Sequence, residues 1–240
     1  MGGPLSRLAT RLTRSTPVRL SVVIPCLDEA AGIVATLDAL RPLRERRHEV
    51  IVVDAGDDGT DALARPRADQ VLRAPRGRAL QMNRGAEAAT GDVLLFLHAD
   101  TRLPASADQA IAEGLASTGR AWGRFDVRLS GRRPSLRVIE TLMSWRSRLT
   151  GIATGDQGIF VTRERFRAIG GYPAILLMED IALSRALKRL GPPVCLRERV
   201  TTSSRRWERN GVVRTVVLMW WLRLRFFLGA DAADLARRYG

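Results

Sequence analysis

A run of apolar residues at 93–97 ends in His98 and, two residues later, Asp100. Glu29 and Asp54 follow two earlier apolar runs in a similar way. Carboxylates alone repel a nucleotide, but a hard divalent cation bridges a carboxylate to a diphosphate. Such a cation also neutralises the charge of a departing diphosphate, because it acts as a Lewis acid. These positions therefore predict a Mg²⁺ or Mn²⁺ site with Asp100 as its protein ligand.

Alternating strands and helices are expected to bring these acids together. Buried apolar runs predict strands at 20–26, 49–60 (closing in a Gly/Asp turn), 68–75 and 92–100, and helical spacing predicts helices at 28–43, 60–65, 77–89 and 105–118. This order predicts an α/β fold with a mostly parallel sheet flanked by helices. The carboxyl ends of such strands meet at one edge, where open α/β sheets bind ligands. The residues expected at that edge are Asp28, Glu29, Asp54, Asp57, Asp58, His98 and Asp100.

The second half of the chain is less regular and is expected to be an accessory to this sheet. Strands are predicted at 121–129 and 157–163, and helices at 135–149 and 178–191. The last helix begins near two acids and ends at Gly191, as helix dipole and capping preferences favour.

The phosphate-binding loops of several other enzyme classes are missing from the sequence. The first turn, PCLDEAAG, lacks the glycines of a dinucleotide fingerprint, and neither a P-loop nor a nucleophile elbow occurs. The turn VVDAGDDGT is similar to the D-x-D-G-T turn of aspartyl-phosphate hydrolases, but Asp54 stands three residues before Asp57 instead of two. A phosphatase of that type stays open as an alternative. Arg78, with Arg76 and Arg84, is expected to contact phosphates of a bound nucleotide.

The composition limits the choice of partners. The formal net charge is +14, and of 39 basic residues only Lys188 is a lysine. The arginines are scattered from Arg7 to Arg238, which favours a solvated surface, and we expect no nucleic-acid partner. Cys26 and Cys195 show neither a metal-binding spacing nor a disulfide framework, so a reducing, cytoplasmic compartment is expected.

Five segments, taken in order, resemble the family-2 inverting glycosyltransferases of the GT-A fold. They are VVIPCLDEA, VIVVDAGDDGT, NRGAEAATGDVLLFLHADT, GDQGIFVTRERFRAIGGY and MEDIALSRALKRLG. The resemblance covers about residues 20–207 and implies a nucleotide-binding half at about 20–118 and an acceptor half at about 119–207. More narrowly, LFLHADT, GDQGIF and SSRRW resemble the arsenosugar-biosynthesis glycosyltransferases.

The resemblance implies donor-binding roles for residues of the first half. Pro25 and Glu29 match the turn that packs on the base and ribose of the nucleotide, and Asp54 matches the acid that reads uracil. Asp100 matches the last acid of the family's D-x-D metal motif. His98 occupies the position of the first acid, a departure that leaves Asp100 as the main metal ligand. Contact of His98 with ribose or phosphate, or a purely structural hydrogen bond at the strand end, both stay open.

Roles for residues of the second half also follow from the resemblance. Asp180 matches the general base, and an inverting transfer needs one carboxylate to take the proton of the acceptor hydroxyl. Glu179 is expected to hold a hydroxyl of the donor or acceptor. Asp156 and Gln157 are expected to line the sugar pocket.

The segment SSRRW partly resembles the Q-x-x-R-W element of processive family members. Arg206 is expected to pair with the diphosphate and Trp207 to form a wall of the acceptor site. Ser203 stands where the glutamine is expected, which argues against polysaccharide synthesis.

The two ends of the chain are expected to lie outside this catalytic domain. Residues 1–19 are predicted to be a basic, flexible leader, and 208–240 an apolar, amphipathic helical segment. Its uninterrupted apolar part, Val216–Leu222, is too short to span a bilayer. Three placements of 212–229 stay open: in the core, in a homodimer interface, or as a peripheral contact with the inner face of a membrane.

Taken together, the residues and the resemblance predict a metal-dependent inverting transfer of a sugar from a nucleotide sugar to a hydroxyl group. The donor is expected to be UDP-linked, because a carboxylate at Asp54 suits the N3–H of uracil. The acceptor is expected to be a small hydroxylated molecule, as in arsenosugar-type biosynthesis. A polyprenyl-phosphate sugar transferase, with a lipid-linked acceptor, is the main alternative.

Overall fold

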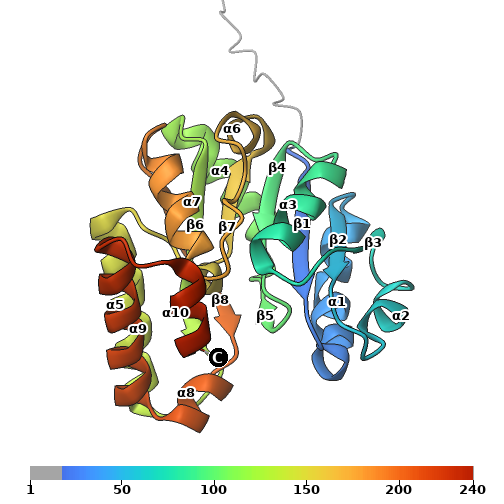
Figure 1. Cartoon of the computed structure of the whole chain (residues 1–240). Helices are drawn as coiled ribbons and strands as arrows, with labels where there is room; N and C mark the ends of the chain where they lie inside the picture. Colours follow the sequence, from blue (N-terminus) through green and yellow to red (C-terminus); the bar gives the residue numbers. More distant parts are fainter. Residues whose placement is uncertain (1–17, 240) are drawn as a thin grey trace, which may run out of the picture.

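The structure is a computed structural model that describes residues 18–239 (Figure 1). The basic leader expected at 1–19 therefore lies outside the described residues, except for Val18 and Arg19. Within the described part, eight strands form one sheet. The strands are β1 (Leu20–Cys26), β2 (Glu49–Asp54), β3 (Gln70–Arg73), β4 (Val93–Phe96), β5 (Thr101–Arg102), β6 (Trp122–Leu129), β7 (Ile159–Thr162) and β8 (Val194–Thr202). The helices are α1 (Ala30–Glu45), α2 (Thr60–Ala64), α3 (Arg78–Ala88), α4 (Ala107–Thr118), α5 (Pro134–Thr150), the short 3₁₀ helix η1 (Gly155–Gln157), α6 (Arg163–Ala168), α7 (Glu179–Lys188), α8 (Arg205–Asn210), α9 (Val212–Phe227) and α10 (Ala232–Tyr239).

The sheet is parallel in its first half and mixed in its second. Its strand order is β3-β2-β1-β4-β7-β6-β8-β5. β1 pairs in parallel with β2 and β4, and β2 pairs in parallel with β3, as the alternation of strands and helices predicts. β7 is antiparallel to β4 and β6, β6 is parallel to β8, and β8 is antiparallel to β5. All strands except β5 and β7 thus run in one direction, and their carboxyl ends lie at one edge.

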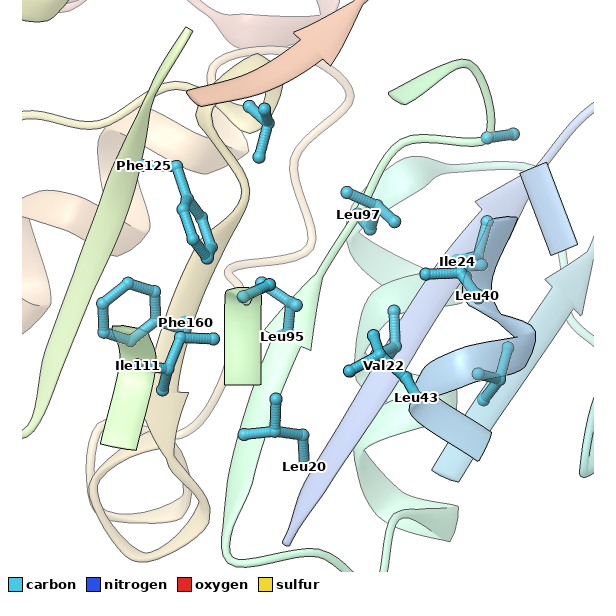
Figure 2. Close-up of a cluster of buried hydrophobic side chains, with 14 of the residues drawn as sticks. Leu20, Val22, Ile24, Leu40, Leu43, Leu95, Leu97, Ile111, Phe125 and Phe160 are labelled. Carbon is cyan, nitrogen blue, oxygen red and sulfur yellow. The ribbon is translucent and has the colours of Figure 1, made fainter. Parts of the chain in front are cut away.

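Helices cover both faces of the sheet and bury its apolar side chains. Successive residues of a strand point to opposite faces. Val22 and Ile24 accordingly belong to a buried cluster with residues of α1 and α4, whereas Val23 belongs to a second cluster with residues of α3, α6 and α7. Figure 2 shows part of the first cluster, with Leu40 and Leu43 of α1 beside β1. Burial on both faces explains why these strands are continuous apolar runs in the sequence.

Three strands differ from the sequence prediction: β4 is shorter than predicted, and β5 and β8 were not predicted. β4 ends at Phe96, earlier than predicted, because residues 97–100 form a turn in which the Thr101 N–H donates to the His98 carbonyl (3.0 Å). The apolar pattern does not predict β8, since three exposed charged residues at 197–199 interrupt it. β8 nevertheless extends the sheet by pairing with β6.

The C-terminal apolar segment forms α9, which lies beside α5 and α10 (Figure 1). Leu222 is fully buried in a cluster with Leu235 of α10 and Ile181 of α7. Val216 packs against a cluster that includes Ile139 of α5. One side of the segment thus packs in the core, and its other side is exposed. None of the helices in residues 18–239 is long and apolar enough to cross a bilayer.

A buried carboxylate holds together the amino ends of β1 and β2. Glu49 Oε2 accepts hydrogen bonds from Ser21 Oγ (2.6 Å) and the Thr90 N–H (2.9 Å), and its Oε1 accepts one from Gln70 Nε2 (3.0 Å). Ser21 Oγ in turn accepts a hydrogen bond from the Gly91 N–H (2.9 Å). Burial opposes ionisation, but the hydrogen bonds outweigh it and lower the pKa of Glu49 below its ordinary value of 4.5.

We expect Glu49→Gln to lower the free energy of unfolding by about 1–3 kcal/mol at neutral pH, because buried donors lose a charged acceptor. A carboxyl whose folded-state pKa is lowered stabilises the fold above its ordinary pKa, and this contribution disappears as the pH falls through the folded-state value. The difference from the unchanged protein should therefore shrink as the pH falls progressively below 4.5. Urea unfolding at neutral pH and at a series of pH values below 4.5 measures it, with the exposed Glu198→Gln as a control. A difference that does not change with pH would contradict this role of the ionised carboxylate.

Candidate functional site

A cavity of about 670 Å³ opens at the carboxyl ends of β1 and β4 and is lined by both halves of the chain. It brings together ten of the residues that the sequence singled out. They are Pro25, Glu29, Arg78, His98, Asp100, Asp156, Glu179, Asp180, Arg206 and Trp207. Asp54 and Gln157 lie outside its lining. The cavity is thus a single place where the expected donor and acceptor residues meet.

The turn after β4 presents His98 and Asp100 to the cavity. The Thr36 hydroxyl donates to the Ala99 carbonyl (2.5 Å) and ties this turn to α1. His98 Nδ1 lies 3.2 Å from Asp156 Oδ1, while His98 Nε2 is buried and has no hydrogen-bond partner among the described residues. The Asp100 side chain is exposed. The buried nitrogen without a partner and the exposed carboxylate are two groups suited to bind a ligand.

Glu29 lies on the same side of the cavity, at the start of α1. Its N–H donates to Thr60 Oγ1 (3.0 Å), and the Ala30 N–H donates to Asp58 Oδ2 (2.9 Å), so the Gly/Asp turn after β2 holds the first turn of the helix. Burial and the charge of Asp100 raise the pKa of Glu29. The two carboxylates therefore form a negative region that suits a cation or a hydroxyl donor.

His98 and Asp100 are suited to a cation that binds together with a nucleotide, and they do not form a complete metal site by themselves. Over the described range 18–239, no group of three or more His, Cys, Asp or Glu side chains is arranged to hold a metal ion. Mg²⁺ is usually held by one or two carboxylates together with substrate phosphates and waters. Asp100 offers one exposed carboxylate, and His98 adds a nitrogen where a second acid was expected. The donor set therefore fits a cation shared between Asp100 and a diphosphate.

Asp180 lies in the first turn of α7, where backbone groups orient it. Its Oδ2 accepts a hydrogen bond from the Gly155 N–H (2.9 Å), and its Oδ1 accepts one from the Ile181 N–H (2.7 Å). A Cβ at Gly155 would collide with the His98 ring, so the close approach of these loops requires glycine. Asp156, the next residue, contacts His98. The segment Gly155–Asp156 thus connects the turn after β4 to the start of α7.

Glu179 is buried next to Asp180 and faces Arg78, whose Nη1 lies 3.4 Å from Glu179 Oε1. Burial and the charge of Asp180 raise the pKa of Glu179, and the charge of Arg78 opposes them. Arg78 begins α3 and Glu179 begins α7, so this contact joins the first half of the chain to the second. Arg206 also lines the cavity, and burial together with the charge of Arg78 lowers its pKa. Arg78 and Arg206 supply positive charge of the kind that binds phosphates.

Asp54 ends β2 as the sequence predicts, but its side chain is fully buried. Its Oδ2 accepts a hydrogen bond from Arg73 Nη1 (2.8 Å), and its Oδ1 accepts one from the Gly56 N–H (3.1 Å). Arg73 also pairs with the exposed Asp57 through Nη2 (2.7 Å). Because Asp54 is buried and paired, it is poorly placed for the nucleophile that the phosphatase alternative requires.

Gln157 lies beneath the cavity and supports it. Its Oε1 accepts a hydrogen bond from the Thr154 N–H (3.2 Å), and its Nε2 donates to Ser147 Oγ (3.1 Å). Gln157 and Thr154 form a capping box around η1, which fixes Gly155 and Asp156. A polar pair before a strand does not reveal from sequence alone which of its members faces outward.

Several lining side chains were not singled out from the sequence. They come from α5, α8 and α9 and include Trp145, Arg146, Arg205, Met219, Trp220 and Arg223. The available signal was the presence of arginines inside two otherwise apolar helical stretches. The helical spacing alone does not show that α5 and α9 would lie side by side at the cavity.

Solved structures share this fold, among them the following three. The mannosyltransferase PcManGT from Pyrobaculum calidifontis, in complex with GDP-Man and Mn²⁺, is 22% identical with a TM-score of 0.59, and the match covers 78% of this chain and 57% of that one. TarS from S. aureus is 15% identical with a TM-score of 0.64, with 78% and 60% covered. Glucosyl-3-phosphoglycerate synthase from Mycobacterium tuberculosis, in complex with Mn²⁺, UDP and glucosyl-3-phosphoglycerate, is 22% identical with a TM-score of 0.55, with 77% and 71% covered. The chain thus spans less than two-thirds of the first two proteins, and at these identities the likeness shows the fold alone.

A search of curated proteins found no match to the chain. The sequence model of glycosyl transferase family 2 matches residues 21–169, which is more than half of the chain. The matched stretch contains Glu29, His98 and Asp100, whereas Asp180 lies beyond it. The helix-covered α/β sheet confirms the expected fold class, with a sheet that is mixed and not parallel throughout. The chain belongs to glycosyl transferase family 2 and has the GT-A fold.

Proposed function

We propose that this glycosyltransferase transfers a sugar from a UDP-linked donor to a hydroxyl group of a small acceptor, with inversion and with Mg²⁺ or Mn²⁺. The observation that carries the proposal is that Asp100 and Asp180 line one cavity. In this proposal, residues of about 20–118 bind the donor and residues of about 119–207 bind the acceptor. The cavity lies where the two halves meet, so both substrates reach it.

The donor's diphosphate is proposed to lie between Asp100 and the arginines. When bound, the cation neutralises charge on the departing diphosphate. Asp100 is its protein ligand, and Arg78 and Arg206 bind the phosphate oxygens from the protein side. Pro25 and Glu29 contact the base and ribose. His98 is proposed to contact ribose or phosphate through Nε2, which is buried and has no partner in the described part of the chain.

Uridine is the proposed nucleoside because a carboxylate at Asp54 accepts the N3–H of uracil. Asp54 already accepts hydrogen bonds from Arg73 and the Gly56 N–H, but a carboxylate has capacity for further donors. Since its side chain is fully buried and lies outside the cavity lining, this contact requires the residues around it to rearrange so that the base reaches it. The solved M. tuberculosis and P. calidifontis proteins contain UDP and GDP-Man, respectively, so a comparison of uridine and guanosine nucleotides tests the base directly.

Asp180 is proposed to be the general base. Its two oxygens are fixed by the Gly155 and Ile181 N–H groups, so the carboxylate is held in one orientation toward the cavity. It takes the proton of the acceptor hydroxyl while that oxygen attacks the anomeric carbon from the face opposite the diphosphate. Glu179 and Asp156 are proposed to hold sugar hydroxyls, with Gln157 and Trp207 as the support and the wall of the pocket.

An acceptor in arsenosugar-type biosynthesis is the finer proposal. It rests on the resemblance of LFLHADT, GDQGIF and SSRRW to that subgroup. The three segments are far apart in the sequence, yet each contributes lining to the same cavity: His98 and Asp100, Asp156, and Arg206 with Trp207. This convergence supports a subgroup-specific substrate.

A lipid-linked acceptor at a membrane surface is a second candidate, favoured by the side of the cavity formed by α5 and α9. Trp145 and Trp220 line the cavity and are 60% and 69% exposed. Exposed Leu149 and Leu224 continue the apolar surface, and Arg225 adds positive charge. Aromatic and basic side chains together favour the interface of a bilayer that contains anionic lipids.

For this second candidate, we expect the protein to sediment with vesicles that contain phosphatidylglycerol. The double variant Trp145→Ser/Trp220→Ser should bind at least several-fold more weakly, because two interfacial anchors are lost. Leu63→Ser, an exposed apolar position on α2, serves as the control. Equal vesicle binding by the double variant and the control would show that this surface does not bind the membrane. A dimer in sedimentation velocity that the double variant does not form would instead indicate that the surface binds a second copy of the chain.

Donor binding tests the proposal at Asp100. UDP at about 100 times its dissociation constant should stabilise the protein by about 2.7 kcal/mol in thermal unfolding. Mn²⁺ should strengthen this effect in the unchanged protein but not in Asp100→Asn, because the amide is a poor ligand for a divalent cation. Asp38→Asn, an exposed acid on α1, is the control. A panel in which UDP and UDP-sugars have no effect while another class of ligand stabilises the protein would overturn the assignment.

Transfer itself tests the role of Asp180. We expect Asp180→Asn to bind UDP and Mn²⁺ as the unchanged protein does, because the amide keeps the shape of the side chain and its oxygen still accepts one of the two backbone N–H bonds. Turnover should fall by about 10²- to 10⁴-fold, the usual contribution of a general base. UDP release in the presence of acceptor measures turnover. Unchanged turnover would remove Asp180 from this role.

A further inference from the structure

Two arginines that the proposed function does not use line the cavity on the side of α5 and α9. They are Arg146 of α5 and Arg223 of α9. Three of their nitrogens, Arg146 Nε, Arg146 Nη2 and Arg223 Nε, are buried and have no hydrogen-bond partner in residues 18–239. Buried guanidinium nitrogens are normally paired, because leaving a buried charged donor without an acceptor is costly.

A neighbour on α5 shows the usual arrangement. Arg148 lies two residues after Arg146, and its Nη2 contacts Asp126 Oδ2 at 2.7 Å while its Nη1 donates to the Cys195 carbonyl (3.0 Å). Neither Arg146 nor Arg223 forms an ion pair within the part of the chain that the structure describes. Unlike Arg148, Arg146 and Arg223 therefore have buried donors for which the described residues supply no acceptor.

The two guanidinium groups are also close enough to act on each other. Burial, followed by the charge of Arg223, lowers the pKa of Arg146 to about 10. Burial likewise lowers the pKa of Arg223. Both groups stay protonated at neutral pH, so the cavity holds two neighbouring positive charges. An anion placed between them would relieve their repulsion and accept their donors.

The acids whose charges act on these arginines already have other partners. The charge of Asp180 acts on both arginines, but its two oxygens accept hydrogen bonds from the Gly155 and Ile181 N–H groups. Asp156 acts on Arg223, and its Oδ1 contacts His98. The arginines therefore lie within electrostatic reach of the proposed base without forming a salt bridge to it.

We propose that Arg146 and Arg223 bind an anionic group of the acceptor, a phosphate or a carboxylate, and so place its hydroxyl beside Asp180. The role of the bound molecule as acceptor rests on the proposed function, whereas the anion site itself does not. Two guanidinium groups on facing helices bind the oxygens of a planar or tetrahedral anion with several charge-assisted hydrogen bonds. Arg146 lies inside the stretch matched by the family model and Arg223 lies beyond it, so the site requires the α9 segment in addition to the matched stretch.

The surroundings define the rest of the ligand. Ile139, Met143 and Met219 line the cavity next to the arginines and offer apolar contact. A phosphate or carboxylate attached to a small hydroxylated body fits this site, and so does the headgroup of a lipid phosphate. In the small hydroxylated molecule and in the lipid alike, Arg146 and Arg223 would bind the anionic group.

Binding of inorganic phosphate to the full chain tests the proposal. Saturating UDP and Mn²⁺ are present so that phosphate cannot occupy the diphosphate position, and isothermal titration measures the dissociation constant. We expect Arg146→Gln and Arg223→Gln each to weaken phosphate binding at least tenfold and the double variant to abolish it. Arg214→Gln, an exposed arginine on α9 outside the cavity lining, should change it less than twofold. Each variant's own affinity for UDP and Mn²⁺ should be unchanged, which shows that it folds.

Two further probes distinguish the source of the anion. Glycerol 3-phosphate represents a soluble phosphate ester, and phosphatidylcholine vesicles with and without phosphatidic acid represent a lipid phosphate. If binding of glycerol 3-phosphate depends on Arg146 and Arg223, the acceptor is soluble. If only binding of phosphatidic acid vesicles depends on them, the acceptor is a lipid. If none of the three anions binds, or if the variants bind them as the unchanged protein does, the proposal is wrong. If UDP has no effect, the same titrations without UDP still test the two arginines, so failure of the donor assignment is seen separately.

Discussion

The relative position of two carboxylates from distant parts of the sequence depends on one short segment. Gly155 donates its N–H to Asp180, and Asp156 contacts His98 in the turn that carries Asp100. A side chain at Gly155 would occupy the space of the His98 ring, so the segment can lie this close to the turn only because it begins with glycine. The two halves of the chain thereby line one cavity, and this proximity is what the proposed inverting transfer between two bound substrates requires.

Charge is distributed around the cavity in a way that favours ligands of both signs. Burial raises the pKa of Glu29 and Glu179, so their ionised forms are less favourable here than in water. Burial lowers the pKa of Arg146 and Arg223, so their charged forms are also disfavoured. Side chains with shifted pKa values cluster at functional sites. A bound ligand of opposite charge would favour their ionised forms. A cation with a diphosphate on one side and an anionic acceptor on the other would complete the pairing.

The sequence predicts the first half of the fold well because each of its strands is a continuous apolar run between turn signals. The polar residues that follow β1 and β4 could therefore be assigned to one edge before the structure was known. Asp54 and Gln157 show the limit of this approach. Each is polar and lies at the end of a strand or before one, yet each is fully buried with a hydrogen-bond partner from β3 or α5. Neither partner is visible in a local pattern, because Arg73 and Ser147 come from other elements.

The second half was harder to predict because its elements depend on packing between distant segments. β8 has charged residues at its centre and forms a strand through its pairing with β6. α9 is apolar on more than one side, and the structure buries Leu222 while leaving Trp220 exposed. The sequence left open whether this segment belongs to the core, a dimer or a membrane surface. Its contribution of Arg223 to the cavity could not be inferred without knowing that α9 lies against α5.

The most direct measurement of the central claim is the position of Mn²⁺ in crystals grown with UDP, located by anomalous scattering. The account predicts a peak about 2.0–2.2 Å from an Asp100 carboxylate oxygen, with the diphosphate bound to it on the side of the cavity that faces Asp180. A peak bound elsewhere, or a diphosphate outside the cavity shared by Asp100 and Asp180, would contradict the account.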